Sequence, residues 1–178
     1  MAEIVRSGNL LAELRGLIEQ ARQHVAQTAN STLTMLHWQL GLRIYREVLA
    51  GQRASYGEEI LPTLSAQLVR EYGKGFAEKN LRRMVQFAEV FPDEKIVVSL
   101  ARELSWTHFI ALIPLKKPLE REYYAEMCRI ERWSVRTLRE RIGSQLYLRT
   151  AIAKKPEAVV QAEISHLRTG GQMTPDMV

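Results

Sequence analysis

Apolar side chains recur every three or four residues along most of this chain, which is the period of one face of an α-helix. In the first segment these apolar positions are Leu10, Leu14, Leu17, Ile18, Ala21 and Val25. Asn9 is a suitable N-cap for a helix to Ala29, and Asn30-Ser31 is a suitable start for a second helix to Leu49. The pattern therefore predicts an N-terminal helical hairpin over residues 1–51.

The rest of the chain is predicted to be helical as well, because no segment alternates with the period of two that marks a strand. A linker is expected at residues 52–57. Helices are expected over residues 58–72, 77–90, 93–104, 106–112, 117–132, 134–148 and 156–168. The sequence thus predicts an all-α, multi-helix fold. Residues 58–168 form a helical domain, either separate from the hairpin or continuous with it, and residues 169–178 form a frayed tail or part of a linker.

Composition places the chain among ordinary globular proteins, since 46% of its 178 residues are hydrophobic and 25% are charged. No apolar run approaches the roughly 20 residues that cross a bilayer, and no apolar segment of a signal peptide follows the N-terminus. The single cysteine, Cys128, excludes an internal disulfide framework, and the four histidines are scattered. We therefore expect a cytoplasmic protein with no metal, cofactor, membrane or small-molecule ligand.

Positive charge gathers in one part of the chain. The formal charge is +5 overall, whereas residues 113–155 carry 11 basic and 5 acidic side chains, a net of +6. A local excess of this kind favours a surface that binds a polyanion such as nucleic acid. The alternative is a solvated helical face on which arginines only maintain solubility.

A first helix-turn-helix unit is predicted around Gly73, which separates two helices by a short glycine turn. On the second of these helices, Leu81, Met84 and Ala88 fall on one side of the helical wheel. Four polar or basic residues fall on the opposite side: Lys79, Arg82, Arg83 and Gln86. Such a face can enter the major groove of DNA, where arginine bonds to guanine and glutamine to adenine. Two antiparallel bundle helices with a solvated face would leave the same pattern.

A second helix-turn-helix unit is predicted within residues 127–142. Ser134 caps its second helix, small Cys128 suits a close approach of two helices, and Trp133 fills the turn. Arg132 stands where such a turn often has glycine. The candidate DNA contacts of this unit and of the basic segment beyond it are Arg132, Arg136, Arg139, Arg141, Lys154 and Lys155.

No catalytic residue is predicted. Asp93-Glu94-Lys95 superficially matches the PD-(D/E)xK nuclease motif, but its acids are adjacent and stand at a helix start, where they favour the helix dipole. We expect a capping role for them. His108 is expected at the edge of a core, and Cys128 is expected to be a small buried residue. The three tryptophans are expected to anchor cores.

Several motifs occur in order over roughly residues 15–168, at a characteristic spacing. They are Tyr56-Gly57, Gly73-Lys74-Gly75-Phe76, Asn80-Leu81-Arg82-Arg83-Met84, Phe91-Pro92, Leu104-Ser105-Trp106-Thr107-His108-Phe109, Arg121-Glu122-Tyr123-Tyr124 and Trp133-Ser134-Val135-Arg136-Thr137-Leu138. In this order they resemble the N-terminal domain of the YhcG-type family of bacterial PD-(D/E)xK nuclease-superfamily proteins. The chain departs from the family pattern at Ala77, where serine is common, and at Val85.

The resemblance implies an all-helical domain that precedes a nuclease domain, with this chain ending near the start of the linker. The first functional hypothesis is accordingly a DNA-binding, targeting module of a nuclease, itself without enzymatic activity. The alternative is a module for homodimerisation through the N-terminal helices, or for binding a protein partner, without direct contact to nucleic acid.

Overall fold

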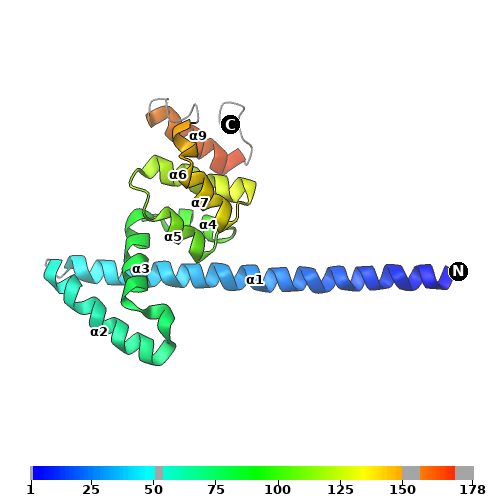
Figure 1. The fold of residues 1–178 in the computed structure, drawn as a ribbon, viewed down its shortest axis with the longest axis horizontal. Helices are drawn as coiled ribbons and strands as arrows, with labels where there is room; N and C mark the ends of the chain where they lie inside the picture. The colour runs from blue at the N-terminus through cyan, green and yellow to red at the C-terminus, as the bar shows by residue number, and fades with distance from the viewer. Residues whose placement is uncertain (1, 51–53, 150–156, 171–178) are drawn as a thin grey trace.

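The computed structural model describes residues 2–50, 54–149 and 157–170, and all regular elements in these ranges are helical (Figure 1). The predicted all-α, multi-helix fold is thereby confirmed. In chain order the elements are α1 (Ala2–Ala50), α2 (Ala54–Tyr72), the 3-10 turn η1 (Lys74–Phe76), α3 (Glu78–Val90), α4 (Glu94–Ala101), α5 (Trp106–Leu112), α6 (Pro118–Glu131), α7 (Val135–Gly143), α8 (Leu146–Arg149) and α9 (Glu157–Gly170).

The predicted N-terminal hairpin is wrong, because α1 is one continuous helix of 49 residues. The expected break at Asn30-Ser31 does not occur. Ser31 Oγ instead donates a hydrogen bond to the carbonyl of Thr28, at 3.0 Å, within the helix. Serine and asparagine lower helix propensity only slightly compared with glycine or proline, so packing of the following residues decides the outcome.

The two halves of α1 have different surroundings. The second half lies along the helical body, while the first half projects beyond it (Figure 1). Every side chain of residues 9–25, which we call the arm, is exposed. The stripe that the sequence predicted on this segment is therefore present but uncovered in the single chain. By contrast Thr34, His37 and Trp38 are buried against the body.

Helix α3 crosses α1 at Gly41, and this crossing leaves no room for a side chain. A Cβ atom at Gly41 would lie 1.8 Å from the carbonyl oxygen of Met84. Around the crossing, Leu61 of α2 and Leu81 and Met84 of α3 form a small buried cluster. Trp38 adds a second tie, because its indole Nε1 donates to the carbonyl of Phe91 at 2.8 Å.

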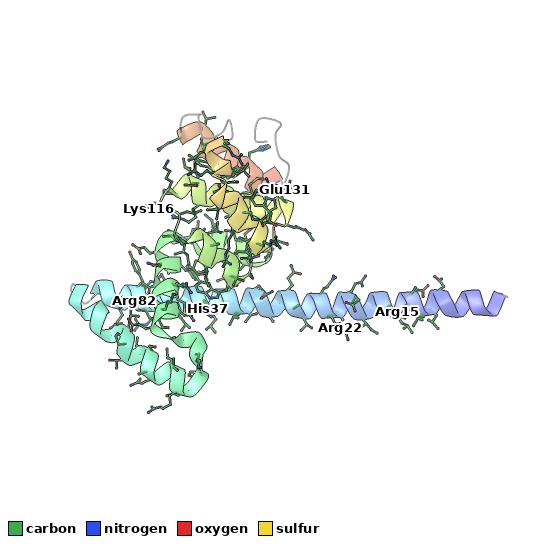
Figure 2. All side chains as sticks on the ribbon, in the orientation of Figure 1. Arg15, Arg22, His37, Arg82, Lys116 and Glu131 are labelled. Atoms are coloured by element: carbon green, nitrogen blue, oxygen red, sulfur yellow. The ribbon has the colours of Figure 1, made fainter. Side chains whose placement is uncertain are left out.

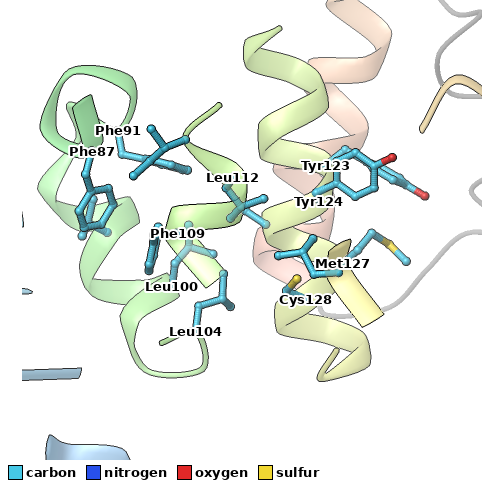
Figure 3. Close-up of a cluster of buried hydrophobic side chains, with 14 of the residues drawn as sticks. Phe87, Phe91, Leu100, Leu104, Phe109, Leu112, Tyr123, Tyr124, Met127 and Cys128 are labelled. Atoms are coloured by element: carbon cyan, nitrogen blue, oxygen red, sulfur yellow. The ribbon is translucent and has the colours of Figure 1, made fainter. Parts of the chain in front are cut away.

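The larger core joins α3, α5 and α6 through aromatic side chains (Figure 3). The ring centroids of Phe87 and Phe109 are 4.4 Å apart, and Phe91 meets Phe109 edge to face at 5.5 Å. Tyr123 and Tyr124 of α6 belong to the same core and are fully buried. Burial of each such ring stabilises the fold by about 2 kcal/mol, which makes this cluster the main source of cohesion. The tryptophans are core residues as expected, with Trp38 buried and Trp106 and Trp133 packed at the edge.

The remaining boundaries agree with the sequence in most places. The helix predicted over 134–148 is wrong in its middle, because it is divided into α7 and α8 by a turn in which Gln145 has a φ of 53°. The predicted linker 52–57 is also partly wrong, because α2 begins at Ala54. Residues 51–53, where the boundary between the predicted segments would fall, and 171–178 of the predicted tail lie outside the described residues. The division into two domains stays a prediction.

Helix α9 is attached to α6 by charged as well as apolar contacts. Val160 and Ile164 are buried in the larger core. Arg168 donates from Nε to Glu126 and from Nη2 to Glu122, each at 2.9 Å. Glu126 is only 2% exposed and also accepts from Arg129 at 2.8 Å, so its buried charge is compensated from two sides.

Among the described helices none has both the length and the apolar character that a membrane crossing requires.

We expect Gly41→Ala to destabilise the protein by about 1–3 kcal/mol, because the new methyl group collides with backbone that cannot retreat. Gly16→Ala is the matched control on the same helix, since no atom lies within 4 Å of its added Cβ. The free energy of unfolding of that control should rise by up to about 1 kcal/mol, because alanine has a higher helix propensity than glycine. Urea unfolding measures both, and equal behaviour of the two variants would contradict the close crossing.

Candidate nucleic-acid interface

Helix α3 has the two faces that the sequence predicted. Its buried side consists of Leu81, Met84, Phe87 and Ala88. On the opposite side Lys79, Arg82 and Gln86 are exposed, while Arg83 is half-buried. Leu81 and Met84 belong to the cluster with α2, and Phe87 and Ala88 belong to the larger core, so the basic side points away from both cores.

The four predicted residues of α3 lie around one shallow surface hollow of about 470 Å³, which Glu78 also lines. Arg82 is visible on this helix in Figure 2. It donates from Nε and Nη2 to Glu78 Oε1, at 2.9 and 2.6 Å. The Arg82 side chain remains 48% exposed, so a surface ion pair of this kind is weak and can exchange for a phosphate. We name Lys79, Arg82, Arg83 and Gln86 the α3 basic face.

The turn before α3 orients this face. Gly73 has a φ of 90°, a left-handed conformation that glycine adopts without strain, and it directs the chain into η1. Asn80 Nδ2 donates to the carbonyl of Gly75 at 3.1 Å, which fixes η1 to the first turn of α3. Phe76 packs half-buried on the cluster of Leu61, Leu81 and Met84.

The second predicted unit consists of α6, a three-residue turn and α7. Arg132 ends α6 in the left-handed region with a φ of 52°, the position where the sequence noted the missing glycine. Ser134 caps α7 by accepting from the Thr137 backbone N–H at 3.1 Å. Leu138 is fully buried, and Cys128 is 2% exposed in the larger core. The predicted tight turn and the predicted apolar side of α7 are therefore both present.

The arginines of α7 lie mostly in solvent. Arg139 and Arg141 are exposed, and the Arg136 side chain is 89% exposed although it pairs with Glu140 at 3.0 Å. Arg141 stacks over the Trp133 ring, with 5.7 Å from Cζ to the ring centroid. These exposed guanidinium groups can reach an external anion without disturbing the core.

His108 joins the turn of this unit to α5. The Ser105 backbone N–H donates to its Nδ1 at 3.1 Å, so Nε2 carries the proton and donates to the Trp133 carbonyl at 2.9 Å. Burial lowers the pKa of His108, and the bond to Trp133 opposes this only partly. His108 is thus a neutral structural histidine at the edge of the core, as expected.

The two basic faces have different supports. Helix α3 packs against α1 and α2, whereas α7 packs against α5, α6 and α8. Arg132, in the turn before α7, lines a hollow of about 440 Å³ together with Arg102 and His108. Arg102 was not selected from the sequence, because no local pattern connects it with a residue thirty positions away. Lys154 and Lys155 lie outside the described residues.

The features that suggested catalysis have structural roles. Asp93 Oδ1 accepts from the Lys95 backbone N–H at 2.8 Å and caps α4, which confirms the capping role for Asp93, and Glu94 stands in the first turn of the helix. Burial raises the pKa of the Cys128 thiol to about 12, so this side chain is no nucleophile at neutral pH. Within the described ranges, no group of three or more His, Cys, Asp or Glu side chains could hold a metal ion.

Comparison with known proteins gives two positive findings. Residues 13–149 match the model of the DUF1016 N-terminal domain. The chain is also 27% identical, over 175 residues, to the protein described as "Putative nuclease YhcG" of Escherichia coli (strain K12). That alignment covers 82% of this chain and 47% of the relative, so the chain spans about half the length of the curated relative it matches. No solved structure shows a significant match.

Acidification from pH 7.5 to 5.5 should lower the free energy of unfolding. The pKa of His108 and that of His37 are lowered by burial, so the unfolded chain, in which histidine titrates near 6.5, binds protons that the folded chain does not. The contribution of these histidines to the free energy of unfolding is therefore fully present above about pH 6.5 and declines below it. Chemical unfolding at several pH values measures the slope.

The variant His108→Gln should show a smaller slope, with His37 supplying the remainder. Its free energy of unfolding should also fall by about 1–3 kcal/mol, because glutamine can replace the Nε2 donor to the Trp133 carbonyl but leaves the Ser105 N–H without the acceptor that Nδ1 provided. His24→Gln makes the same substitution on the exposed arm and is the matched control. An unchanged slope in His108→Gln would show that His108 is not the titrating group.

Proposed function

The chain belongs to the DUF1016 N-terminal domain family, and we propose that it is a DNA-binding module that directs a nuclease to its substrate. The relative named as a nuclease is about twice as long as the aligned segment, which supports the assignment of binding and catalysis to separate domains. In this proposal the described helices bind DNA in the bacterial cytoplasm, and the catalytic residues belong to another domain. The module itself needs no cofactor.

The observation that carries the proposal is the α3 basic face. Lys79, Arg82 and Gln86 are exposed together around one hollow, on a helix whose opposite side is anchored in two cores. A helix of this kind fits the major groove, where arginine and glutamine read base edges and lysine contacts phosphate. The rigid support matters, because readout of bases requires side chains that are held in place.

The basic side of α7 supports the same function from a second helix. Its exposed Arg136 and Arg139 follow an N-capped helix start. Phosphate contacts by such side chains add affinity that does not depend on base sequence. Arg132 and Arg141 are available for the same purpose on either side of the turn and helix.

Binding to a DNA duplex should weaken steeply with salt, because each neutralised phosphate releases counterions and contributes a slope near −0.9. We expect Lys79→Ala with Arg82→Ala to lower the affinity for DNA. The salt slope of this variant should become shallower by the contribution of about one to two phosphate contacts. Arg136→Ala with Arg139→Ala tests α7 separately. Fluorescence anisotropy at several salt concentrations measures all variants.

The matched control is Arg15→Ala with Arg22→Ala, which removes two exposed helical arginines from the arm and should bind as the parent chain does. Binding that is weaker than micromolar and unaffected by both pairs of substitutions would overturn the proposal. An equal loss in the control would show that only net charge matters.

Self-association is a second candidate function, and a specific observation favours it. The arm exposes Leu10, Leu14, Leu17, Ile18 and Val25, and each of these residues is at least 47% exposed. Contiguous apolar surface of this extent is uncommon on monomers and marks interaction sites. In this candidate the chain dimerises through α1, with or without DNA.

Light scattering on the intact chain should therefore give twice the chain mass of 20.4 kDa. Leu14→Glu with Leu17→Glu should shift that mass toward the monomer, because a charge in the buried stripe of a dimer has no partner. Glu13→Gln with Glu19→Gln changes the same helix without touching the stripe and should remain dimeric. A parent chain that stays monomeric at all concentrations would remove this candidate.

A further inference from the structure

The arm is a helix with a wide apolar stripe and no partner in its own chain. Together with Leu33 and Leu36 further along α1, its exposed apolar side chains recur along the helix toward the body. Their exposed fractions lie between 39% and 67%. Exposed apolar side chains that gather on one element in this way mark an interaction site on a soluble protein.

The same molecule has an apolar groove without an occupant among the described residues. It lies between α1 and α2 at the other end of α1, has a volume of about 330 Å³, and we name it the α1–α2 groove. Its apolar lining consists of Leu40, Ile44, Ile60, Leu64 and Leu68. Arg43 and Glu47, paired with each other at 2.6 Å, form its polar rim. The lining side chains are half-buried, so a helix placed there would complete their burial.

We propose that the arm of a second copy of this chain occupies the α1–α2 groove, and that the two copies exchange arms across a two-fold axis. This inference rests on the proposed self-association and names the surface that it uses. The two α1 helices then run antiparallel, because the groove lies at one end of α1 and the arm at the other. A parallel pair would join arm to arm and leave both grooves unfilled.

The order of residues on α1 supports this arrangement. In an antiparallel pair, residues equally far from the two-fold axis on either side meet across the copies. If the axis passes near Ala29, Leu14 faces Ile44, Ile18 faces Leu40 and Val25 faces Leu33. Each of these pairs is apolar, so one choice of centre matches three apolar residues of the arm to the groove and to the exposed Leu33.

The spacing of apolar residues along α1 fits a long helix pair. Such residues recur eleven positions apart, as in Leu14, Val25 and Leu36, and again in Ile18, Ala29 and Leu40. An eleven-residue repeat keeps one seam in contact between helices that cross with a slight right-handed twist. The repeat runs through both the arm and the groove, which connects the two surfaces in one interface.

Cysteine cross-linking tests the arrangement on the intact chain. Leu14→Cys with Arg43→Cys places one thiol on the arm and one on the groove rim. Both positions are solvent-exposed, so the substitutions leave the cores intact. Within one chain they are about 44 Å apart along a single helix, so a short bis-maleimide reagent joins them only between copies. The native Cys128 is buried and does not compete.

We expect most of the double variant to migrate at twice the chain mass after cross-linking, and neither single variant to do so. The single variants are matched controls, because in the antiparallel pair equal positions of the two copies lie more than about 40 Å apart. Circular dichroism confirms that each variant is folded.

The possible outcomes separate this inference from the function on which it rests. Efficient cross-linking of Leu14→Cys alone would show parallel arm-to-arm pairing and overturn the exchange, while self-association would stand. A dimeric mass without cross-linking of the double variant would place the contact on another surface and also overturn the exchange. A monomeric parent chain would overturn both.

Discussion

The close approach of α1 and α3 at Gly41 is the constraint on which the rest of the molecule depends. With no side chain at this position, the backbone of α3 lies directly on α1, where a Cβ would be 1.8 Å from the Met84 oxygen. The crossing holds Leu81 and Met84 against α2 on one side and brings Phe87 and Phe91 into the larger core on the other. The direction of α3, and hence of its basic face, follows from this contact.

Polar groups then set the orientation of elements that apolar packing alone would leave adjustable. His108 connects the start of α5 to the turn before α7, and Trp38 connects α1 to the end of α3. Tyr124 donates to the Arg141 carbonyl and accepts from the Tyr147 N–H, which fixes the turn between α7 and α8 to α6. Buried hydrogen bonds of this kind contribute modest net stability but are costly to leave unmade, so they select one arrangement.

The distribution of burial separates the chain into a supported body and an unsupported arm. Basic side chains on α3 and α7 belong to the body, where buried partners on the opposite side of each helix hold them in place. The arm has only exposed side chains, and helices gain most of their stability from tertiary packing. The DNA contacts that we propose therefore lie on the body, and the self-association that we propose joins the arm of one copy to the α1–α2 groove of the other.

The sequence by itself determined most helices, their caps and their buried sides. These features depend on neighbours within about four residues, as the periodic apolar residues of α3 and the caps Asp93 and Ser134 illustrate. Only the tertiary structure decided that α1 continues through Asn30, that Gly41 is the crossing point, and that Arg102 and Arg132 line the same hollow. The left-handed turns at Arg132 and Gln145 likewise follow from how the helices dock. These outcomes depend on contacts between residues far apart in the chain, which no local pattern encodes.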